Sequence, residues 1–416
     1  MASRNFTILG GGIAGLAAAR TLCDAGHAAT VLEAAPRVGG RVASDRLDGF
    51  TLDRGFQIYL SAYPEGRRFL DLKALDLKAF MPGALVWNGA RAATIAHPLR
   101  EPLAALSGVL RGIVPPADAL RMLPFARAAL RGPSDAPGAP GTSALERLRA
   151  AGISSRTIDL FFRSFFGGVF FDRSLETDAS RLDFLLRMFA EGFACVPSRG
   201  MGEIAAQMER NARGARIRTG ARVERLEGRT AVLASGERVE SDGVVIATDA
   251  DGLRALVPSL PAIHWCGTLS AWFATPDPAE LPSWLVLNGS GRGAFNHGAA
   301  MTSVAPSYGA AGQGLFVANT AFLPRDFRTS ADVAEDMRRT LTQILGARAT
   351  SGWRLLAVQR IERAIPRQWT DDVAVRAPHE LGERVFVAGD HVEDASINGA
   401  MRSGRLAAER LMASFA

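Results

Sequence analysis

The stretch Phe6-Thr7-Ile8-Leu9-Gly10-Gly11-Gly12-Ile13-Ala14-Gly15 decides the fold of this 416-residue chain. Its first four residues predict a short buried strand, and the glycines at positions 10, 12 and 15 predict a tight turn that opens a helix. The alanine-rich residues from Leu16 to Ala25 continue that helix, and Ala29–Leu32 predicts a second strand that ends at Glu33. Strand, glycine-rich turn, helix and strand together predict a βαβ unit of the Rossmann type.

The residue types of this unit suit a dinucleotide. The first glycine permits the tight turn, the second leaves room for backbone beside a pyrophosphate, and the third lets the helix approach the strand. The helix N-terminus directs unpaired N–H groups and the positive end of its dipole at the diphosphate. Glu33 can accept hydrogen bonds from ribose hydroxyls, and its charge disfavours the 2′-phosphate of NADP. The pattern leaves FAD and NAD open, and the predicted site comprises Gly10, Gly12, Ile13, Ala14, Gly15, Glu33 and Ala34.

Further motifs follow in order along the chain. Val38-Gly39-Gly40-Arg41-Val42 comes soon after Glu33, and Asp53-Arg54-Gly55-Phe56-Gln57 follows it. Pro197-Ser198-Arg199-Gly200-Met201 opens a predicted helix that runs to about residue 211. Val385-Phe386-Val387-Ala388-Gly389-Asp390 predicts a strand, and Ser396-Ile397-Asn398-Gly399-Ala400 precedes a predicted helix over 401–412. Together these motifs resemble those of the flavin amine oxidase and phytoene desaturase superfamily, which uses FAD.

The resemblance implies roles for the residues near the N-terminal unit. It implies that Arg41, preceded by Gly40, supports the diphosphate, a role suited to the fixed fork of guanidinium donors. It also implies that Gly55 and Phe56 run beside the isoalloxazine ring. The cysteine that binds flavin covalently in some members is missing near the C-terminus, so we expect noncovalent FAD.

The resemblance implies further roles for residues far downstream. The backbone of Val223 would contact the adenine, and Asp390, preceded by Gly389, would hold the ribitol. Ile397, just before the closing helix, would lie at the cofactor, and the N-terminus of that helix would approach the pyrimidine ring and stabilise the negative charge of reduced flavin. Taken alone, Val223 could be an ordinary strand residue and Asp390 an ordinary helix cap.

We therefore expect an α/β fold, with a discontinuous Rossmann-type FAD-binding domain and a second, α+β substrate domain. Residues 216–226 predict one strand of the first domain, and 242–248 predict a buried strand of its parallel sheet. The expected FAD-binding domain comprises 1–70, 195–255 and 355–416, and the expected substrate domain comprises 71–194 and 256–354.

Composition narrows the class of protein. The formal net charge is +6, but no run of like charges is typical of a nucleic-acid-binding tail, so we expect no nucleic acid partner. The three cysteines lie far apart without CxxC spacing, which indicates neither a disulfide framework nor a metal site. No apolar stretch reaches the length of a transmembrane helix, and we expect a cytoplasmic protein. The leucine- and arginine-rich residues 98–131 favour either ordinary amphipathic helices or a segment in peripheral contact with a membrane.

The sequence says less about the residues that face the flavin. Phenylalanines at positions 161, 162, 165 and 166 recur at helical spacing, which is typical of a core-facing helix and also of an apolar tunnel wall. Typical amine oxidases of the superfamily place a lysine at flavin N5, and this chain has no lysine after Lys78. They also place an aromatic residue just before the closing helix, whereas residues 391–397 contain none. No general base is identified, and the substrate-pocket candidates are Tyr59, Tyr63, His297 and Trp369.

These observations favour an FAD-dependent oxidoreductase. Our leading hypothesis is a desaturase or dehydrogenase that passes hydride from a lipophilic, isoprenoid-like substrate to the flavin, which oxygen or a quinone then reoxidises. An amine or amino-acid oxidase is the first alternative, and the missing lysine and aromatic argue against it. A non-catalytic carrier of prenyl or lipid groups is the second alternative, and the intact FAD motifs argue against it.

Overall fold

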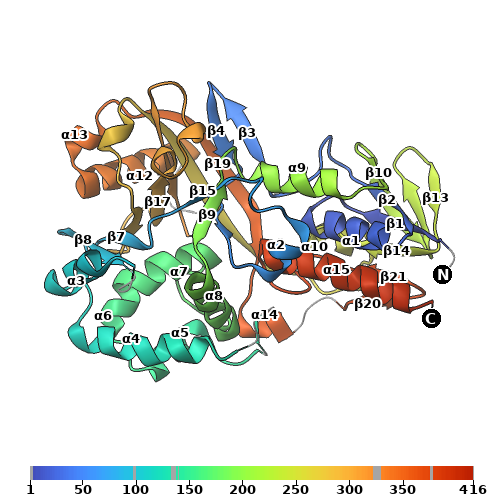
Figure 1. Cartoon of the computed structure of the whole chain (residues 1–416), viewed down its shortest axis with the longest axis horizontal. Helices are drawn as coiled ribbons and strands as arrows, with labels where there is room; N and C mark the ends of the chain where they lie inside the picture. Colours follow the sequence, from blue (N-terminus) through green and yellow to red (C-terminus); the bar gives the residue numbers. More distant parts are fainter. Residues whose placement is uncertain are drawn as a thin grey trace.

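The computed structural model describes residues 3–96, 100–132, 137–138, 140–321, 329–374 and 378–415. A six-stranded sheet forms one half of the molecule, and a seven-stranded sheet with a layer of helices forms the other (Figure 1). Residues 98 and 99, the start of the leucine- and arginine-rich segment, lie outside the described residues.

The six-stranded sheet is the predicted Rossmann-type unit extended by distant segments. Five of its strands run parallel, and the last pairs antiparallel to its neighbour. In spatial order the strands are β10 (Ala215–Arg218), β2 (Ala28–Leu32), β1 (Asn5–Leu9), β14 (Gly243–Ile246), β21 (Val385–Val387) and β20 (Glu380–Gly382).

The central strands of this sheet are buried on both faces. Ile8, Val31 and Val245 pack in the same core as helices α1 (Ile13–Asp24) and α15 (Ile397–Ala413). Alternate residues such as Leu9 and Ile246 pack instead against the other face, because successive strand side chains point to opposite sides of a sheet. That face is covered by α10 (Ala250–Leu256) and by the antiparallel strands β11 (Val223–Glu227), β12 (Thr230–Leu233) and β13 (Arg238–Glu240).

Two predicted elements differ from the observed ones. The single strand predicted over 216–226 is divided into β10 and β11, which belong to different sheets. Gly220 lies between them in the left-handed region at φ +67°, where the chain changes direction. The closing helix begins at Ile397 rather than at Met401, because the Ser396 hydroxyl accepts a hydrogen bond from the Gly399 N–H and caps the helix earlier.

The seven-stranded sheet is mainly antiparallel, with one parallel pair between β16 and β7. Helix α12 (Ser330–Leu345) packs on one of its faces. The long strand β19 lies within the range expected for the FAD-binding domain, yet it pairs with β15 in this sheet. The strands in order are β19 (Arg354–Pro366), β15 (Trp265–Thr275), β18 (Gly314–Asn319), β17 (His297–Ala300), β16 (Leu285–Asn288), β7 (Gly83–Trp87) and β8 (Ala92–Ala96).

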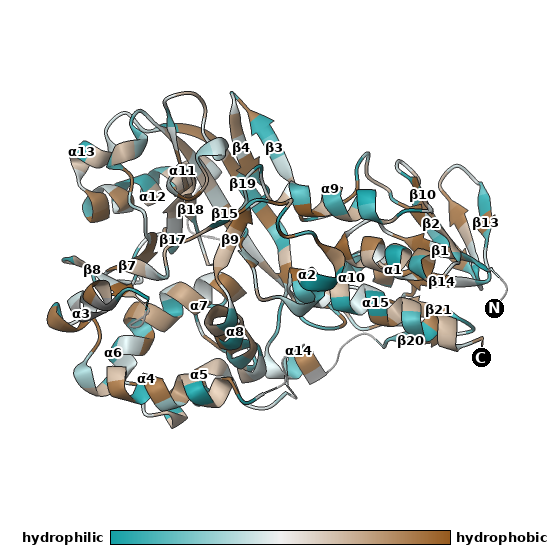
Figure 2. Ribbon diagram, viewed as in Figure 1, coloured by the Kyte–Doolittle hydropathy of each residue, from teal (hydrophilic) through white to brown (hydrophobic). Residues whose placement is uncertain are grey.

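A layer of helices lies against the other face of this sheet, at the lower left of Figure 1. At its outer edge, α3 is mainly hydrophobic, whereas hydrophobic and hydrophilic residues mix along α4 (Figure 2). The layer comprises α3 (Pro102–Leu110), α4 (Pro116–Ala129), α5 (Ala144–Ala150), α6 (Ser155–Thr157), the π-helical turn Ile158–Phe162, α7 (Arg163–Phe170) and α8 (Ala179–Glu191).

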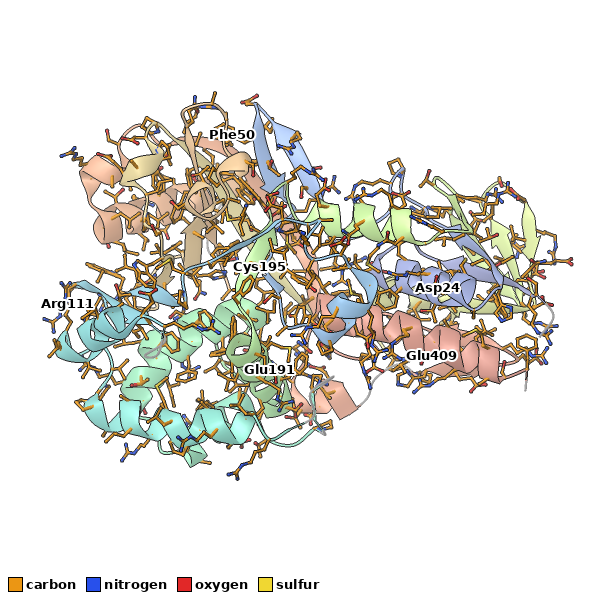
Figure 3. The ribbon with its side chains drawn as sticks, in the orientation of Figure 1. Asp24, Phe50, Arg111, Glu191, Cys195 and Glu409 are labelled. Atoms are coloured by element: carbon orange, nitrogen blue, oxygen red, sulfur yellow. The ribbon has the colours of Figure 1, made fainter. Side chains whose placement is uncertain are left out.

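Short elements join the two halves near the middle of the molecule. Strand β9 pairs with both β5 and β6, and Cys195 of β9 is central in Figure 3. The bounds of these three strands are Tyr59–Leu60 for β5, Leu77–Ala79 for β6 and Ala194–Pro197 for β9. The remaining short elements are β3 (Ser44–Leu47), β4 (Phe50–Asp53), α2 (Pro64–Phe69), α9 (Gly202–Asn211), α11 (Met301–Val304), α13 (Ala347–Thr350) and α14 (Thr370–Ala374).

Candidate active site

One cavity of about 2000 Å³ extends from the six-stranded sheet to the helical layer. It brings together most of the residues that the sequence singled out, from three distant parts of the chain. The predicted residues that line it are Gly10, Gly12, Ile13, Ala14, Glu33, Ala34, Gly40, Arg41, Gly55, Phe56, Val223, Gly389, Asp390 and Ile397, with the pocket candidates Tyr63 and His297.

Three of the selected residues do not line this cavity. Gly15 lies against the glycine turn, where an added Cβ would be 1.9 Å from the Gly10 carbonyl oxygen. Tyr59 is fully buried and packs edge-on against Tyr63. Trp369 donates from Nε1 to the Asp172 carboxylate at 3.1 Å and lies under the Arg367 guanidinium. Tyr59 and Trp369 are therefore packing residues in this structure.

The glycine-rich turn has the shape that a diphosphate requires. Gly10 has a φ of +107°, and a Cβ there would lie 2.6 Å from the Ala247 carbonyl oxygen. A Cβ at Gly12 would meet nothing within 4 Å, so the backbone at this position opens onto free space in the cavity. The first and third glycines thus permit packing, and the second allows a phosphate group to approach the start of α1.

Glu33 is fixed by backbone groups at one end of the cavity. Its Oε2 accepts a hydrogen bond from the Gly11 N–H at 2.6 Å, and its Oε1 accepts one from the Ala35 N–H at 2.7 Å. Each carboxylate oxygen retains acceptor capacity for a ribose hydroxyl. Val223 lines the same region of the cavity, which suits an adenosine group.

Arg41 and Asp390, to which the resemblance gives separate roles, are ion-paired. Arg41 Nη2 lies 2.6 Å from Asp390 Oδ1, and Nη1 donates to the Ala364 carbonyl at 2.9 Å. Burial is the largest single effect and opposes the charge of Asp390, but the attraction and hydrogen bond of Arg41, together with His391, outweigh it, so the pKa of Asp390 is well below its usual range. The cavity therefore holds a fixed cation and a fixed carboxylate side by side, next to the glycine turn.

The two helices that begin at the cavity pack closely against each other. A Cβ at Gly404 of α15 would lie 2.0 Å from the Ala14 carbonyl oxygen of α1. Asp24 of α1 and Glu409 of α15 mark these neighbouring helices in Figure 3. Because both helices start at the cavity, their positive dipole ends converge on it. Such a site suits the diphosphate and also a ring that becomes negative on reduction.

The segment predicted beside the isoalloxazine is held by the second sheet. The Gly55 N–H donates to Gln359 Oε1 at 2.7 Å, and the Phe56 N–H donates to Ser270 Oγ at 3.2 Å. Gly55 has a φ of +87°, and a Cβ there would lie 2.8 Å from Ile361. Sequence reasoning missed Gln359 and Ser270, since nothing local distinguishes them from other polar strand residues.

Asp53, just before this segment, is a third residue whose role sequence reasoning missed. It is fully buried and accepts hydrogen bonds from Ser44 Oγ at 2.5 Å, the Met201 N–H at 2.9 Å and the Tyr308 hydroxyl at 2.8 Å. Burial raises the pKa of Asp53 to about 6, although these hydrogen bonds act in the opposite direction. Asp53 thereby joins β3, α9 and the 306–308 turn to the strand that leads to Gly55.

Apolar side chains line the part of the cavity that lies within the helical layer. Phe162 and Phe166 are buried in the core, whereas Phe161 and Phe165 are partly exposed and stack on each other with ring centroids 5.5 Å apart. All four contribute to the cavity wall. The phenylalanine-rich helix therefore serves both as core and as lining.

His297 lies against α7, where a Cβ at Gly168 would be 2.6 Å from its Nδ1, and its ring centroid is 5.4 Å from that of Phe56. Its Nδ1 is 2.9 Å from the Asn296 amide nitrogen. Burial, together with the nearby Arg173, lowers the pKa of His297 to about 3, so the ring is neutral at physiological pH. Within the described ranges, no group of three His, Cys, Asp or Glu side chains could hold a metal ion.

Comparison with known proteins identifies related sequences and folds. The family model for flavin containing amine oxidoreductases matches residues 13–412. A carotenoid 3,4-desaturase of Haloarcula japonica is 38% identical over 86 residues, which cover 18% of this chain and 17% of that protein. A putrescine oxidase of Kocuria rosea is 52% identical over 54 residues, which cover 13% of this chain and 11% of that protein. A solved structure of a putative protoporphyrinogen oxidase from Exiguobacterium sp. 255-15 has the same fold, with a TM-score of 0.75 and 17% identity over 100% of both chains.

The contact of α1 with α15 predicts the effect of a methyl group at Gly404. We expect Gly404→Ala to push the helices apart, to destabilise the fold by about 1 to 3 kcal/mol and to weaken FAD binding. Thermal unfolding and the FAD content of the purified protein measure both effects. Arg410→Ala, at an exposed site on the same helix, is the control and should leave both unchanged. A Gly404→Ala protein with normal stability and FAD content would contradict the prediction.

The buried Asp53 predicts a pH dependence of stability. The pKa of its carboxyl is raised from 3.8 to about 6 on folding, so the protein loses stability as pH rises from about 4 to about 6, and the loss levels off above pH 6, where the carboxyl is ionised in both states. Asn at this position cannot ionise and keeps one strong acceptor. We expect the stability of Asp53→Asn relative to the unmodified protein to rise by roughly 2 to 3 kcal/mol between pH 4 and pH 8. Denaturant unfolding at a series of pH values measures the difference, and a constant difference would refute it.

Proposed function

Because this chain belongs to the family of flavin-containing amine oxidoreductases, we propose that it is an FAD-dependent desaturase or dehydrogenase of a lipophilic, isoprenoid-like substrate. The family and its relatives make the chain an FAD-dependent oxidoreductase. The single observation that carries the finer proposal is the phenylalanine- and leucine-lined part of the cavity, which continues from the flavin-binding segments through the helical layer. An apolar wall of this length suits a hydrocarbon chain.

The residues at the glycine-rich end fit FAD. Gly12 and the start of α1 would hold the diphosphate with Arg41, Glu33 would hold the adenosine ribose, and Asp390 would hold the ribitol. The chemistry that the flavin supplies is acceptance of hydride from a substrate carbon, with oxygen or a quinone as the final acceptor. Among the described residues that line the cavity there is no cysteine, which supports noncovalent binding.

The protein residues of the substrate side position the substrate and exclude water. Phe161 and Phe165, whose rings stack on each other, add apolar side chains to the cavity wall, which disfavours water there. His297 meets the substrate as a neutral ring, because its pKa of about 3 keeps it uncharged. The N-terminus of α15 stabilises negative charge that develops at its end of the cavity.

The outer edge of the helical layer supports a peripheral contact with a membrane. Leu103, Leu110 and Leu120 are exposed by 85%, 76% and 70%, and Leu123 and Leu130 are also exposed. Arg111, which directly follows Leu110 in the sequence, lies at the far end of the layer in Figure 3. Leu120 and Leu123 line the cavity as well, so its opening lies on this surface. We propose a cytoplasmic protein that collects its substrate from a bilayer through this opening.

No helix among the described residues is long and apolar enough to cross a membrane.

Substrate oxidation is testable under anaerobic conditions. We expect polyene isoprenoids to bleach the visible flavin absorption of the FAD-loaded protein, and amines to leave it unchanged. Phe165→Glu should slow bleaching at least tenfold, on the order of the cost of burying a carboxylate in the apolar wall. Phe165→Leu, which keeps the wall apolar, is its control. Bleaching by amines alone would favour an amine oxidase, and protein that never takes up FAD would favour a lipid carrier.

Membrane contact is testable by flotation with vesicles of phosphatidylcholine and phosphatidylglycerol. We expect the protein to float with them, and the combined change of Leu103, Leu110, Leu120 and Leu123 to Ser to abolish flotation, because each leucine contributes about 1.5 to 3 kcal/mol when fully buried. Leu47→Ser with Leu355→Ser, at exposed sites elsewhere, is the control. Failure of the unmodified protein to float would overturn the proposal.

A further inference from the structure

Helix α8, which ends at Glu191 in Figure 3, turns one face toward the cavity. Four residues on this face are apolar, namely Phe184, Leu185, Leu186 and Phe189. The fifth is Arg181, one turn before Leu185. A guanidinium at the start of an otherwise apolar wall is the feature that the proposed function leaves unexplained.

Arg181 is buried without a direct counter-ion. Its exposed fraction is 6%, and its Nε has no hydrogen-bond partner. Within the described part of the chain, no carboxylate lies within ion-pair distance of it. Burial lowers the pKa of Arg181, and more distant attraction to Asp394, Asp178 and Glu393 offsets this only in part. Arginine stays charged in proteins, so a buried, unpaired guanidinium is costly unless a ligand pairs with it.

The nearby carboxylates are engaged with other groups. Glu393 pairs with Arg402 and lies 3.8 Å from His379. Asp178 accepts hydrogen bonds from the Gly141 N–H at 2.9 Å and the Ser180 N–H at 3.0 Å. Asp178 caps α8, and the side chain of Glu393 is largely buried in its ion pair with Arg402. Asp394, which attracts Arg181 most strongly, lines the same cavity and accepts a hydrogen bond from Ser396 Oγ. These acids do not neutralise the Arg181 guanidinium in the cavity.

Arg181 lies at the flavin-binding end of the apolar region. Asp394 attracts Arg181 and lines the same cavity. Ser396 and Ile397, at the start of α15, line the cavity as well. Tyr63, which stacks on Phe184 of α8, lines the same region. The cation is therefore at the inner end of the apolar wall, and the exposed leucines of α3 and α4 are at the outer end.

We propose that Arg181 binds a carboxylate at one end of an otherwise apolar substrate, whose hydrocarbon chain extends toward α3 and α4. The planar fork of a guanidinium matches the two oxygens of a carboxylate, and the apolar surroundings strengthen the pair. This inference rests on the proposed function, because it treats the apolar region as the substrate site. It narrows the substrate class to lipophilic acids.

The probes are farnesoic acid and its methyl ester, which differ only in the charged end group. Their affinities for the FAD-loaded protein are measured by calorimetry without turnover. We expect the acid to bind at least about tenfold more tightly than the ester, as a charge-assisted contact implies. Arg181→Gln should bring the acid to the affinity of the ester, and Arg181→Lys should retain part of the preference. Equal binding of acid and ester by the unmodified protein overturns the proposal, and this measurement needs no variant.

Arg127→Gln is the matched control. Arg127 also lines the cavity, but it is exposed on α4 at the outer end. We expect the acid preference to survive this change. If Arg127→Gln removes the preference and Arg181→Gln does not, the acid binds at the opening and the proposal is wrong.

The FAD affinity of Arg181→Gln separates a substrate role from a cofactor role. We expect it to match that of the unmodified protein, and a tenfold loss would assign Arg181 to the cofactor instead.

Binding of the acid and bleaching of the flavin also separate this inference from the proposed desaturase function. An Arg181-dependent preference for the acid without any bleaching would leave this inference standing and reject the desaturase. Bleaching by isoprenoids without a preference for the acid would support the desaturase and reject the carboxylate-binding role of Arg181.

Discussion

The arrangement of this molecule depends on the close contact of α1 and α15. Gly404 has no side chain, so its backbone reaches the Ala14 carbonyl of the first helix. The helices continue from β1 and β21, which lie on either side of β14 in the same parallel sheet. Their N-termini therefore open at one edge, where the carboxyl ends of parallel strands form ligand sites. A wider separation would divide this single cavity into two partial sites.

The two ends of the cavity meet different physical demands. At the glycine-rich end, charges are fixed by other protein groups: backbone amides hold Glu33, and Arg41 holds Asp390. Such pre-arranged groups do not need to reorganise when a charged cofactor binds. At the other end, aromatic and aliphatic side chains form a wall that offers few directional contacts. Selectivity there depends on length, shape and the rare polar group, such as the buried Arg181.

The cofactor end was predictable from the sequence because its determinants are local. Strand, glycine turn and helix follow one another within residues 5–24, and each later motif carries its own glycine or charged residue. The substrate end was not predictable to the same degree. Gly55 is held by Gln359, 304 positions away, and no local pattern marks that partner. Tyr59 and Trp369 were expected in the pocket but do not line the cavity. The sequence does not reveal whether an aromatic side chain points into a cavity or into the surrounding core. Arg181 resembles any surface arginine of an amphipathic helix until the packing of α8 is known.

The ion pair of Arg41 and Asp390 joins residues that are 349 positions apart. A ribosome must therefore add several hundred residues after the glycine turn before the second half of the site exists. Until then the nascent chain exposes the apolar face of α1, which α15 later covers. The first βαβ unit can form early, but it cannot retain its cofactor through these contacts. Capture of flavin through both halves of the site therefore has to follow synthesis of the residues around Asp390.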